Sequence, residues 1–394
     1  MKQKVELSRN ILLLAGLVVL AVGFVAGTRS EQIYGAVGPL LGFRVDTSKL
    51  DLSSVQHTYQ ALKTHYNGSL NTDKLIAGAN KGLVEAIGDP YTVYMDSKEA
   101  AQFNDELSGD IGGGIGAEIG LRGKQPTIIR TLPDNPAVKA GLRAGDVITA
   151  VNDEPMVGQS VEKTVKAIKG EAGTTVKIAV IRAGENRTFT MTRQIINNPS
   201  VTSEVKDGVG IMTISRFDEG TVSLARKAAS AFKAQNVKGV VVDLRGNGGG
   251  YLDAAPGVAG LWLKNDKTVV SVRGNGGNET YKAEGEPVLA GVKSIVLVDG
   301  NTASAAEIVA GALQQQGVAT LLGQKTFGKG TVQEIIPLGD GSQLKVTIKR
   351  WYLPKGQNIT GDGIQPDIKV ELTQQDLDRG HDRQIERAKQ LLVR

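Results

Sequence analysis

The chain has 394 residues, of which 40% are hydrophobic and only 4% aromatic, and its formal net charge is +5, from 46 basic and 41 acidic side chains. This length predicts two or three domains, the composition excludes a disordered protein, and basic residues scattered among acids without aromatic platforms argue against nucleic-acid binding. The absence of cysteine excludes disulfides and thiol catalysis. With only three histidines, a catalytic zinc or a Ser-His-Asp triad is disfavoured. No metal or cofactor is therefore expected.

The N-terminus has the pattern of a membrane anchor. Basic residues precede the uncharged apolar run Ile11–Gly27, which is at the short end of what can span a bilayer as a helix. The basic flank belongs on the cytoplasmic side, which places the rest of the chain outside the cytoplasm. Small residues at the end of the run leave a cleavable signal peptide open, but no A-x-A site is present, so a retained anchor is favoured. We therefore expect a cytoplasmic tip and transmembrane helix over residues 1–27 and a linker over 28–50.

Residues 51–107 are expected to form a small helical cap or bundle. Apolar residues recur at helical spacing on both sides of a break at Asn71. The segment G-D-P-Y-T-V-Y-M, Gly88–Met95, then ends the second helix because it contains Gly and Pro. His57 and His65 are expected on helix surfaces rather than as ligands, since their spacing does not make them neighbours on a helix.

A glycine-rich run opens the next domain. The order expected after it is strand, short helix, strand, longer helix and strand, with the short helix in P-A-V-K-A-G-L-R-A-G-D-V-I, Pro136–Ile148. A plain glycine turn would explain the run alone, but over residues 108–194 the chain resembles a PDZ domain of the bacterial-protease type, a β-sandwich or barrel with two helices. The resemblance implies that one loop turns its backbone N–H groups toward a C-terminal carboxylate while the peptide pairs with the adjoining strand. The residues of that loop are Gly114, Ile115, Gly116 and Ala117.

From Val201 onward, short β-branched strands alternate with helices, which predicts an α/β layer with buried strands. The expected strands are Gly210–Ser215, Gly239–Leu244, Val269–Val272, Ser294–Val298 and Thr320–Leu322, and the expected helices are Thr221–Ala234 and Ala303–Gln314. A β-rich part, Val332–Pro337 and Gln343–Tyr352, and a charged helix, Gln375–Val393, follow. The fold class expected is thus multidomain α/β, with a core over 195–372, β-rich toward its end, and a C-terminal helix over 373–394.

Ser304 admits two interpretations. The segment Ser304-Ala-Ala-Glu307 is a capping box, in which the serine caps a helix and the glutamate returns a hydrogen bond. Such caps open many helices, so the pattern alone favours a structural role. The same position suits a nucleophile, because a serine at a helix N-terminus feels the positive end of the helix dipole and has free backbone N–H groups beside it for an oxyanion.

Lys329 is the candidate base for that serine. It lies between Gly328 and Gly330, which allow close backbone approach and bring no competing side chain. A lysine acts as a base only when neutral, so its pKa has to fall toward the working pH by desolvation. Gln333 can hydrogen-bond the amine without adding a negative charge that would raise this pKa. Four residues along a strand would place Lys329 and Gln333 too far apart for their side chains to form a hydrogen bond. This interpretation therefore requires that the chain from Lys329 to Gln333 turn rather than extend.

A P-loop is a rival interpretation of the same segment. The pattern G-x-x-x-x-G-K, Gly323 to Lys329, follows a predicted strand. A P-loop then needs Ser or Thr and a helix, whereas here Gly330 follows and V-Q-E-I-I-P-L is strand-like. Without the magnesium-binding hydroxyl and the helix N-terminus, nucleotide binding is disfavoured.

Several longer motifs together resemble the carboxyl-terminal processing proteases, the S41 serine peptidases. In chain order they are D-P-Y-T-V-Y-M, D-L-R-G-N-G-G-G, T-A-S-A-A-E-I-V-A-G-A-L, G-Q-K-T-F-G-K-G-T-V-Q and G-D-G-I-Q-P-D. The match follows the order of the family from about Leu52 to the C-terminus. The resemblance implies a Ser-Lys dyad assisted by Gln, on Ser304, Lys329 and Gln333. It also implies oxyanion donors at the backbone amides of Ala305 and Gly250, with Gly249 as neighbour. One departure is Ala306, where the family often has a second serine.

The resemblance implies an extracytoplasmic serine endopeptidase of the bacterial cytoplasmic membrane that cleaves proteins near or from their C-termini. Apolar C-terminal tails would be captured by the PDZ domain, whose ligand, or a partner protein, would gate the site. A membrane-tethered PDZ adaptor that binds tails without cleavage is the alternative function. The substrate, the activating partner and a homo-oligomeric state are left open by the sequence.

Overall fold

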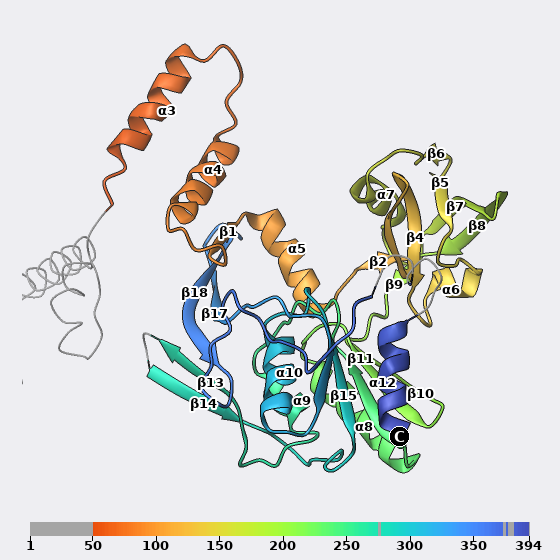
Figure 1. Cartoon of the computed structure of the whole chain (residues 1–394). Helices are drawn as coiled ribbons and strands as arrows, with labels where there is room; N and C mark the ends of the chain where they lie inside the picture. Colours follow the sequence, from red (N-terminus) through yellow and green to blue (C-terminus); the bar gives the residue numbers. More distant parts are fainter. Residues whose placement is uncertain (1–49, 275–276, 373–375, 377–381, 394) are drawn as a thin grey trace, which may run out of the picture. The chain divides into compact units, whose positions relative to one another are not determined.

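A computed structural model describes residues 50–274, 277–372, 376 and 382–393 (Figure 1). The predicted anchor, 1–27, and nearly all of the linker lie outside the described residues. Within the described part of the chain, no helix combines the length and the apolar character needed to cross a membrane. The chain divides into two compact units, Met1–Leu75 and Ile76–Arg394, and the candidate site lies in the second.

Helices are present in the region 51–107 where the sequence predicts them. Helix α3, Ser53–His65, buries none of its side chains. Helix α4, Thr72–Glu85, buries only Val84, and α5, Ser97–Ser108, buries only Ala100. The small helical cap or bundle stays a prediction. The sequence analysis missed strand β1, Val93–Met95, which lies between α4 and α5 and pairs with a strand of the core.

The PDZ region contains the predicted order of elements. The expected succession of strand, short helix, strand, longer helix and strand is made by β4, Gln125–Thr131; α6, Pro136–Ala140; β5, Val147–Val151; α7, Val161–Ile168; and β7, Thr175–Arg182. The antiparallel sheet has the order β3-β4-β5-β7-β8, with β6 beside β5. The remaining strands are β2, Gly113–Gly114; β3, Ala117–Arg122; β6, Glu154–Pro155; β8, Glu185–Thr192; and β9, Gln194–Ile195.

The core is built on a six-stranded sheet of order β10-β11-β12-β15-β16-β19. These strands are Val201–Lys206, Val209–Ile214, Gly239–Asp243, Ser294–Val298, Thr320–Gly323 and Ile368–Lys369. All neighbours are parallel except β10 and β11. Every residue of β12 and β15 is buried, as expected for parallel strands covered on both faces.

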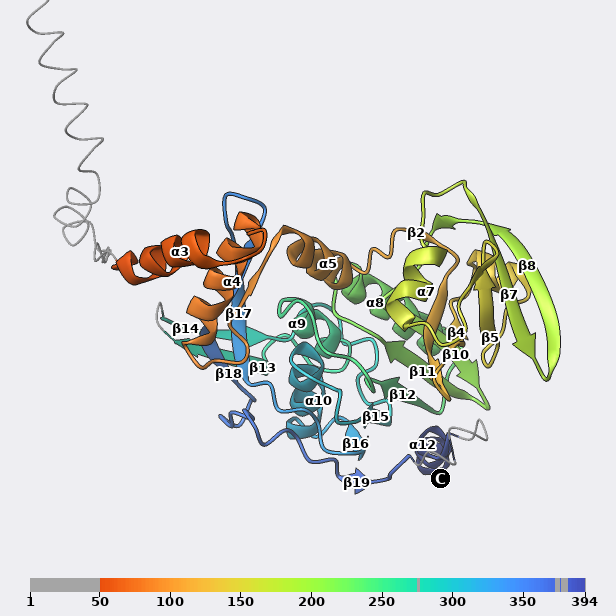
Figure 2. The same ribbon diagram turned by 90° about the horizontal axis from the view of Figure 1, so that it is seen from above.

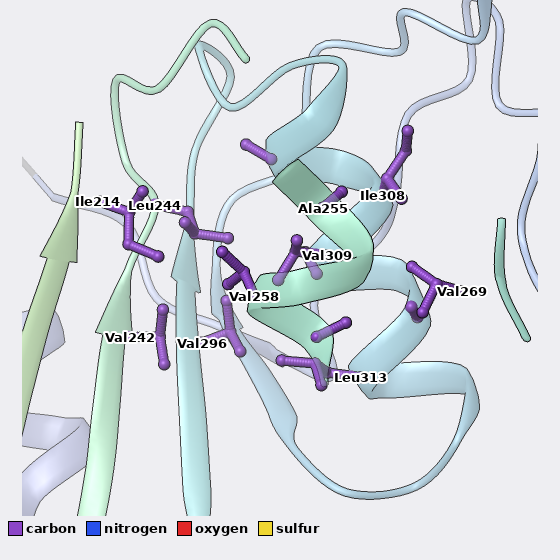
Figure 3. Packing of buried hydrophobic residues seen from close by; sticks show 14 of the residues in the cluster. Ile214, Val242, Leu244, Ala255, Val258, Val269, Val296, Ile308, Val309 and Leu313 are labelled. Carbon is purple, nitrogen blue, oxygen red and sulfur yellow. The ribbon is translucent and has the colours of Figure 1, made fainter. Parts of the chain in front are cut away.

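Helices cover both faces of this sheet (Figure 2). Helices α8, Thr221–Ala234, α9, Ala254–Ala259, and α10, Ala305–Gln315, pack on one face, and α12, Arg383–Val393, packs on the other. Successive strand residues alternate between the faces, so Val242 and Val296 meet α9 and α10 whereas Val241 and Ile295 face α12. Figure 3 shows the first of these clusters, with Val309 and Leu313 of α10 packed toward Val296.

A second, antiparallel sheet lies beside the α/β layer. It contains β13, Thr268–Gly274, β14, Gly277–Lys282, β17, Thr331–Pro337, and β18, Gln343–Tyr352, together with β1. Strand β18 pairs with β17 along one edge and with β1 and β13 on the other. The prediction that 269–272 belongs to the α/β layer was wrong, because a short apolar run does not indicate which of two sheets it joins.

Arg245 links the end of β12 to the start of α12. Its guanidinium contacts the carboxylates of Asp243 at 2.5 Å and Asp382 at 2.8 Å, and it also donates to Gln384. The Arg245 side chain is only 15% exposed and that of Asp243 only 11%. The D-L-R motif therefore fastens the loop after β12 to the C-terminal helix.

We expect Arg245→Ala to lower the free energy of unfolding by about 3 kcal/mol, because it leaves the largely buried Asp243 carboxylate and the half-buried Asp382 carboxylate without this cation. Urea denaturation followed by circular dichroism measures this loss. The matched control is Arg187→Ala, which breaks an exposed pair with Glu185 and should cost less than about 1 kcal/mol. Equal losses in the two variants would contradict a structural role for the Arg245 cluster.

Candidate active site

Ser304 occupies a strained position at the turn between β15 and α10. Its φ is 56° and its ψ is −122°. Residues that cap helix N-termini normally have extended backbone, and a positive φ is uncommon for any residue other than glycine. Strain of this kind persists only where the surroundings enforce it, and it clusters at functional sites. A serine on a strained strand-to-helix turn is also how α/β-hydrolases expose their nucleophile.

The glutamate half of the predicted capping box is present at this helix end. The Ser304 N–H donates to Glu307 Oε2 at 2.9 Å. The N–H of Ala305, the first residue of α10, has no hydrogen-bond partner among the described residues. An unpaired N–H at the positive end of a helix dipole is suited to an anionic oxygen.

The glycine loop after β12 lies against Ser304, since β12 and β15 are adjacent parallel strands that end at the same edge of the sheet. A Cβ on Gly249 would come within 2.6 Å of Ser304 Cβ, and a Cβ on Gly250 within 2.0 Å of the Phe217 oxygen. The Gly249 N–H donates to Asn247 Oδ1 at 2.8 Å. The Gly250 N–H has no partner in the part of the chain that the structure describes, so it is the available donor of the two glycines.

Glu307 joins the Ser304 turn to the loop that carries Lys329. Its carboxylate is fully buried and accepts four hydrogen bonds. Besides the Ser304 N–H, the donors are Thr326 Oγ1 at 2.5 Å, Gly328 N–H at 2.7 Å and Lys329 N–H at 3.0 Å. The sequence predicted only the contact of Glu307 with the Ser304 turn. The contacts to 326–329 could not be deduced from a local pattern, because they join segments about twenty residues apart.

The two glycines beside Lys329 allow the close approach that the sequence predicted. The Gly328 oxygen accepts a hydrogen bond from Gly361 N–H at 3.0 Å, and the Gly328 φ is 94°. A Cβ on Gly330 would meet Thr360 Oγ1 at 2.5 Å and Asn358 Nδ2 at 2.6 Å. The strand predicted after Lys329 is present as β17, so a P-loop helix does not follow this lysine.

The ammonium group of Lys329 is in an environment that favours its neutral form. Burial and the nearby charge of Lys345 lower the pKa of Lys329 to about 8, against the opposing effect of the Glu307 carboxylate. The Lys329 Nζ also lies 5.7 Å from the centre of the Tyr91 ring. At pH 7 a pKa of about 8 leaves roughly one lysine in ten neutral, compared with roughly one in three thousand at its ordinary value.

Gln333 lies on the extended strand β17, so the prediction that Lys329 to Gln333 must turn was wrong for most of this segment. A β-bulge between Val332 and Gln333 shifts the register against β18 and redirects the side chain. The Gln333 Nε2 donates to Thr331 Oγ1 at 2.8 Å and to Thr347 Oγ1 at 3.3 Å. Within the described ranges no hydrogen bond joins Gln333 to Lys329.

Ser304, Lys329 and Gln333 line one cavity of about 510 Å³, together with Gly249 and Gly250. The cavity has an apolar part and a charged part. Its apolar lining consists of Leu252, Ile308, Val332 and Trp351, and its charged lining also includes Glu106, Arg216 and Lys345. The structure therefore brings together all the predicted catalytic residues beside a pocket that fits an apolar side chain. Sequence reasoning missed Lys345 and Tyr91.

The predicted carboxylate-binding loop of the PDZ region lines a separate cavity of about 210 Å³. Gly114, Ile115, Gly116 and Ala117 all border it. Val165 and Ile168 of α7 give it an apolar wall, Lys169 supplies positive charge, and Arg130 is paired with Glu118, which also borders the cavity. A groove between strand β3 and α7 with this lining is suited to an extended peptide that ends in an apolar residue and a carboxylate.

Comparison with known proteins identifies the family. Residues 208–370 match the family model described as "Peptidase family S41", 113–192 match "PDZ domain", and 42–99 match "Activating protease CtpB N-terminal domain". The "Carboxy-terminal processing protease CtpA" of Bacillus subtilis is 35% identical over 358 residues, which cover 90% of this chain and 76% of that protein. The chain belongs to peptidase family S41. It is accordingly a hydrolase, a serine-type carboxyl-terminal processing protease.

Two further relatives agree with this assignment. The "Probable CtpA-like serine protease" of Staphylococcus haemolyticus is 36% identical, with 91% of this S41 peptidase and 72% of that protein covered. Among solved structures, the "Photosystem II D1 C-terminal processing protease" matches with a TM-score of 0.50 and 28% identity, covering 82% of this chain and 87% of that chain.

We expect the activity of this S41 peptidase to rise with pH up to about 8, because only the neutral form of Lys329 can accept a proton. Lys345→Met removes a repelling charge and raises the pKa of Lys329, so the rise should move to higher pH and kcat/KM at pH 7 should fall about threefold. The measurement is kcat/KM for a peptide substrate over about two pH units on either side of the Lys329 pKa of about 8. Lys282→Met, an exposed lysine of the same sheet, is the control. A profile that Lys345→Met leaves unchanged would contradict this electrostatic role.

Proposed function

We propose that this S41 peptidase is an endopeptidase that uses Ser304 as nucleophile, Lys329 as general base and Gln333 as the residue that orients the base. The observation that carries the proposal is the pairing, in one cavity, of a strained serine at a helix N-terminus with a lysine whose pKa is lowered to about 8. A serine hydroxyl needs a nearby base to attack at neutral pH, and a desolvated lysine provides one.

The proposed reaction has two halves. Lys329 takes the proton of the Ser304 hydroxyl as the oxygen attacks the scissile carbonyl carbon, which forms a tetrahedral intermediate. Lys329 then gives the proton to the departing amine, and an acyl-enzyme remains on Ser304. Water, deprotonated by the same lysine, hydrolyses the ester and releases the new C-terminus.

The oxyanion of each intermediate would be bound by the backbone N–H groups of Ala305 and Gly250. Both N–H groups are unpaired within the part of the chain that is described, and both belong to segments that contact Ser304. Gly249, whose N–H is already donated to Asn247, supports the loop without supplying a donor. Fixed donors of this kind stabilise charge that develops only in the transition state.

Substrate capture is assigned to the PDZ region. Its cavity combines the glycine loop, an apolar wall and the Lys169 ammonium group, which suits an apolar C-terminal tail and its carboxylate. The apolar part of the active-site cavity would accept an apolar side chain next to the cleaved bond. We further propose that binding of a tail, or of an activating partner protein, at the PDZ region regulates cleavage.

The proposed location is the extracytoplasmic face of a bacterial cytoplasmic membrane. It rests on the basic flank and apolar run of residues 1–27, which would hold the peptidase by a single membrane-spanning helix. Membership of a peptidase family disfavours the alternative of a non-cleaving adaptor. A homo-oligomer remains compatible with these features.

Ser304→Ala and Lys329→Met should each reduce kcat for an unfolded protein substrate by a factor of about a thousand or more, because each removes one member of the dyad. Binding of a peptide with an apolar C-terminus, measured by fluorescence anisotropy, should be unchanged in both. Lys325→Met, an exposed lysine of the same loop, should retain full activity. Undiminished proteolysis by either dyad variant would refute the proposed chemistry.

A further inference from the structure

We propose that Arg216 couples the binding of a peptide at the PDZ region to the oxyanion donor of the active site. Its guanidinium joins the chain that leaves the PDZ region to the segment whose backbone holds Gly250. This inference rests on the proposed function, in which both cavities take part. It goes further by naming the residue through which a bound tail acts on catalysis.

Arg216 lies at the border between the two cavities. It is part of the lining of the active-site cavity. Its Nη2 donates to the backbone oxygen of Asn198, which borders the PDZ cavity together with Ile196. The Arg216 side chain is only 17% exposed, so this contact is largely shielded from water. A single side chain therefore connects the lining of the catalytic cavity with the lining of the peptide cavity.

Both connections between the PDZ region and the rest of the chain pass against this guanidinium. The entering connection begins at Gly109, which ends α5 with a φ of 75°. A Cβ on Gly109 would come within 2.0 Å of Arg216 Nη2, so the backbone lies directly on the arginine and leaves no space for a side chain. The leaving connection is held through the Asn198 oxygen. A displacement of either connection therefore acts on Arg216.

Asn135 connects the carboxylate-binding loop to the leaving chain. Its side chain is buried, and its Nδ2 donates to the Asn197 oxygen at 2.7 Å while its Oδ1 accepts from the Asn197 N–H at 3.0 Å. A Cβ on Gly116, within the loop, would come within 2.2 Å of Asn135 Cβ. The loop thus packs on the asparagine that binds the residue before Asn198.

A buried carboxylate fixes Arg216 to the core. Asp218 Oδ2 is 2.9 Å from Arg216 Nη2. Asp218 Oδ1 lies 2.8 Å from the Ser200 hydroxyl and 2.9 Å from the Thr221 hydroxyl. Asp218, Ser200 and Thr221 are all buried. The guanidinium is therefore held in one position between the chain that leaves the PDZ region and the core.

The residue after Arg216 determines the position of the oxyanion donor. The Phe217 N–H donates to the Gly249 oxygen at 2.9 Å, and the Phe217 oxygen accepts from the Tyr251 N–H at 2.8 Å. Phe217 thus pairs with both neighbours of Gly250, in a parallel bridge. Oxyanion donors act only when they lie within hydrogen-bond distance of the developing charge. A displacement of Phe217 therefore changes the stabilisation that the Gly250 N–H provides.

The coupling is expected to be positive. A tail bound beside Asn198 restricts the leaving chain and, through Arg216, the oxyanion loop. A second ligand that needs the same ordered loop then loses less conformational entropy when it binds. By reciprocity, an anion in the oxyanion site tightens the binding of the tail by the factor by which the tail favours the anion. Couplings of this kind are typically about fivefold or more.

The test measures tail binding with and without a ligand on Ser304. The ligand is an N-acylated peptidyl boronate with an apolar terminal residue and no carboxylate, so it does not compete for the carboxylate-binding loop. Its boron bonds to the Ser304 oxygen, the proton passes to Lys329, and the tetrahedral anion mimics the intermediate. Anisotropy gives the dissociation constant of a fluorescent peptide with an apolar C-terminus, and mass spectrometry checks that the peptide is intact.

The unmutated enzyme should bind the tail about fivefold more tightly when the boronate is bound. Arg216→Met removes the polar contacts of the guanidinium and keeps an apolar side chain, so it should bind the tail equally well with and without the boronate. Arg187→Met, the same change at an exposed arginine of the PDZ region, should keep the difference shown by the unmutated enzyme.

A tail affinity that the boronate leaves unchanged or weakens in the unmutated enzyme would overturn the inference, as would a difference that persists in Arg216→Met. If Arg216→Met fails to fold by circular dichroism, Arg216→Met/Asp218→Asn replaces it, because the second change removes the buried charge left without a cation. Absence of inhibition by the boronate, absence of tail binding, or full activity of Ser304→Ala would instead refute the proposed function on which this inference rests.

Discussion

The buried carboxylate of Glu307 is the interaction on which the arrangement of the site depends. It is fully buried, and a buried charge is tolerable only when donors surround it. Two segments supply those donors, the Ser304 turn and the loop from Thr326 to Lys329. Satisfying one carboxylate therefore fixes the backbone that carries the serine against the backbone that carries the lysine. The parallel sheet makes this possible, because β15 and β16 are neighbours whose carboxyl ends lead into these two segments.

The same carboxylate creates an electrostatic conflict that the surrounding residues offset. A negative charge beside Lys329 favours its protonated form, which is useless as a base. Burial of the ammonium and repulsion from Lys345 act in the opposite direction and prevail. Gln333, held by Thr331 and Thr347, lines the same cavity as Lys329 without adding a charge. The Glu307 carboxylate thus fixes the backbone of the site, and Lys345 limits the effect of that carboxylate on the pKa of Lys329.

The sequence predicted the local elements of this fold well and its long-range pairings poorly. Ser304, Lys329 and the glycines beside them lie in patterns whose chemistry is local, so capping, dipole and close approach could be predicted. The strand that contains 269–272 was assigned to the wrong sheet, and β1 was missed, because its partner β18 lies about 250 residues further along the chain. The contact of Tyr91 with Lys329 depends on the same distant pairing, and the β-bulge at Gln333 interrupts the pairing of β17 with β18. No spacing rule within one segment could have indicated them.

The central claim is that Lys329 activates Ser304, and covalent trapping tests it most directly. A peptidyl diphenyl phosphonate with an apolar terminal residue forms a stable adduct only with an activated serine hydroxyl, and peptide mass mapping locates the adduct. The account predicts a single modified residue, Ser304, with a labelling rate that rises with pH toward about 8 and collapses in Lys329→Met. An adduct on another residue, or labelling of Lys329→Met at the unmutated rate, would contradict it.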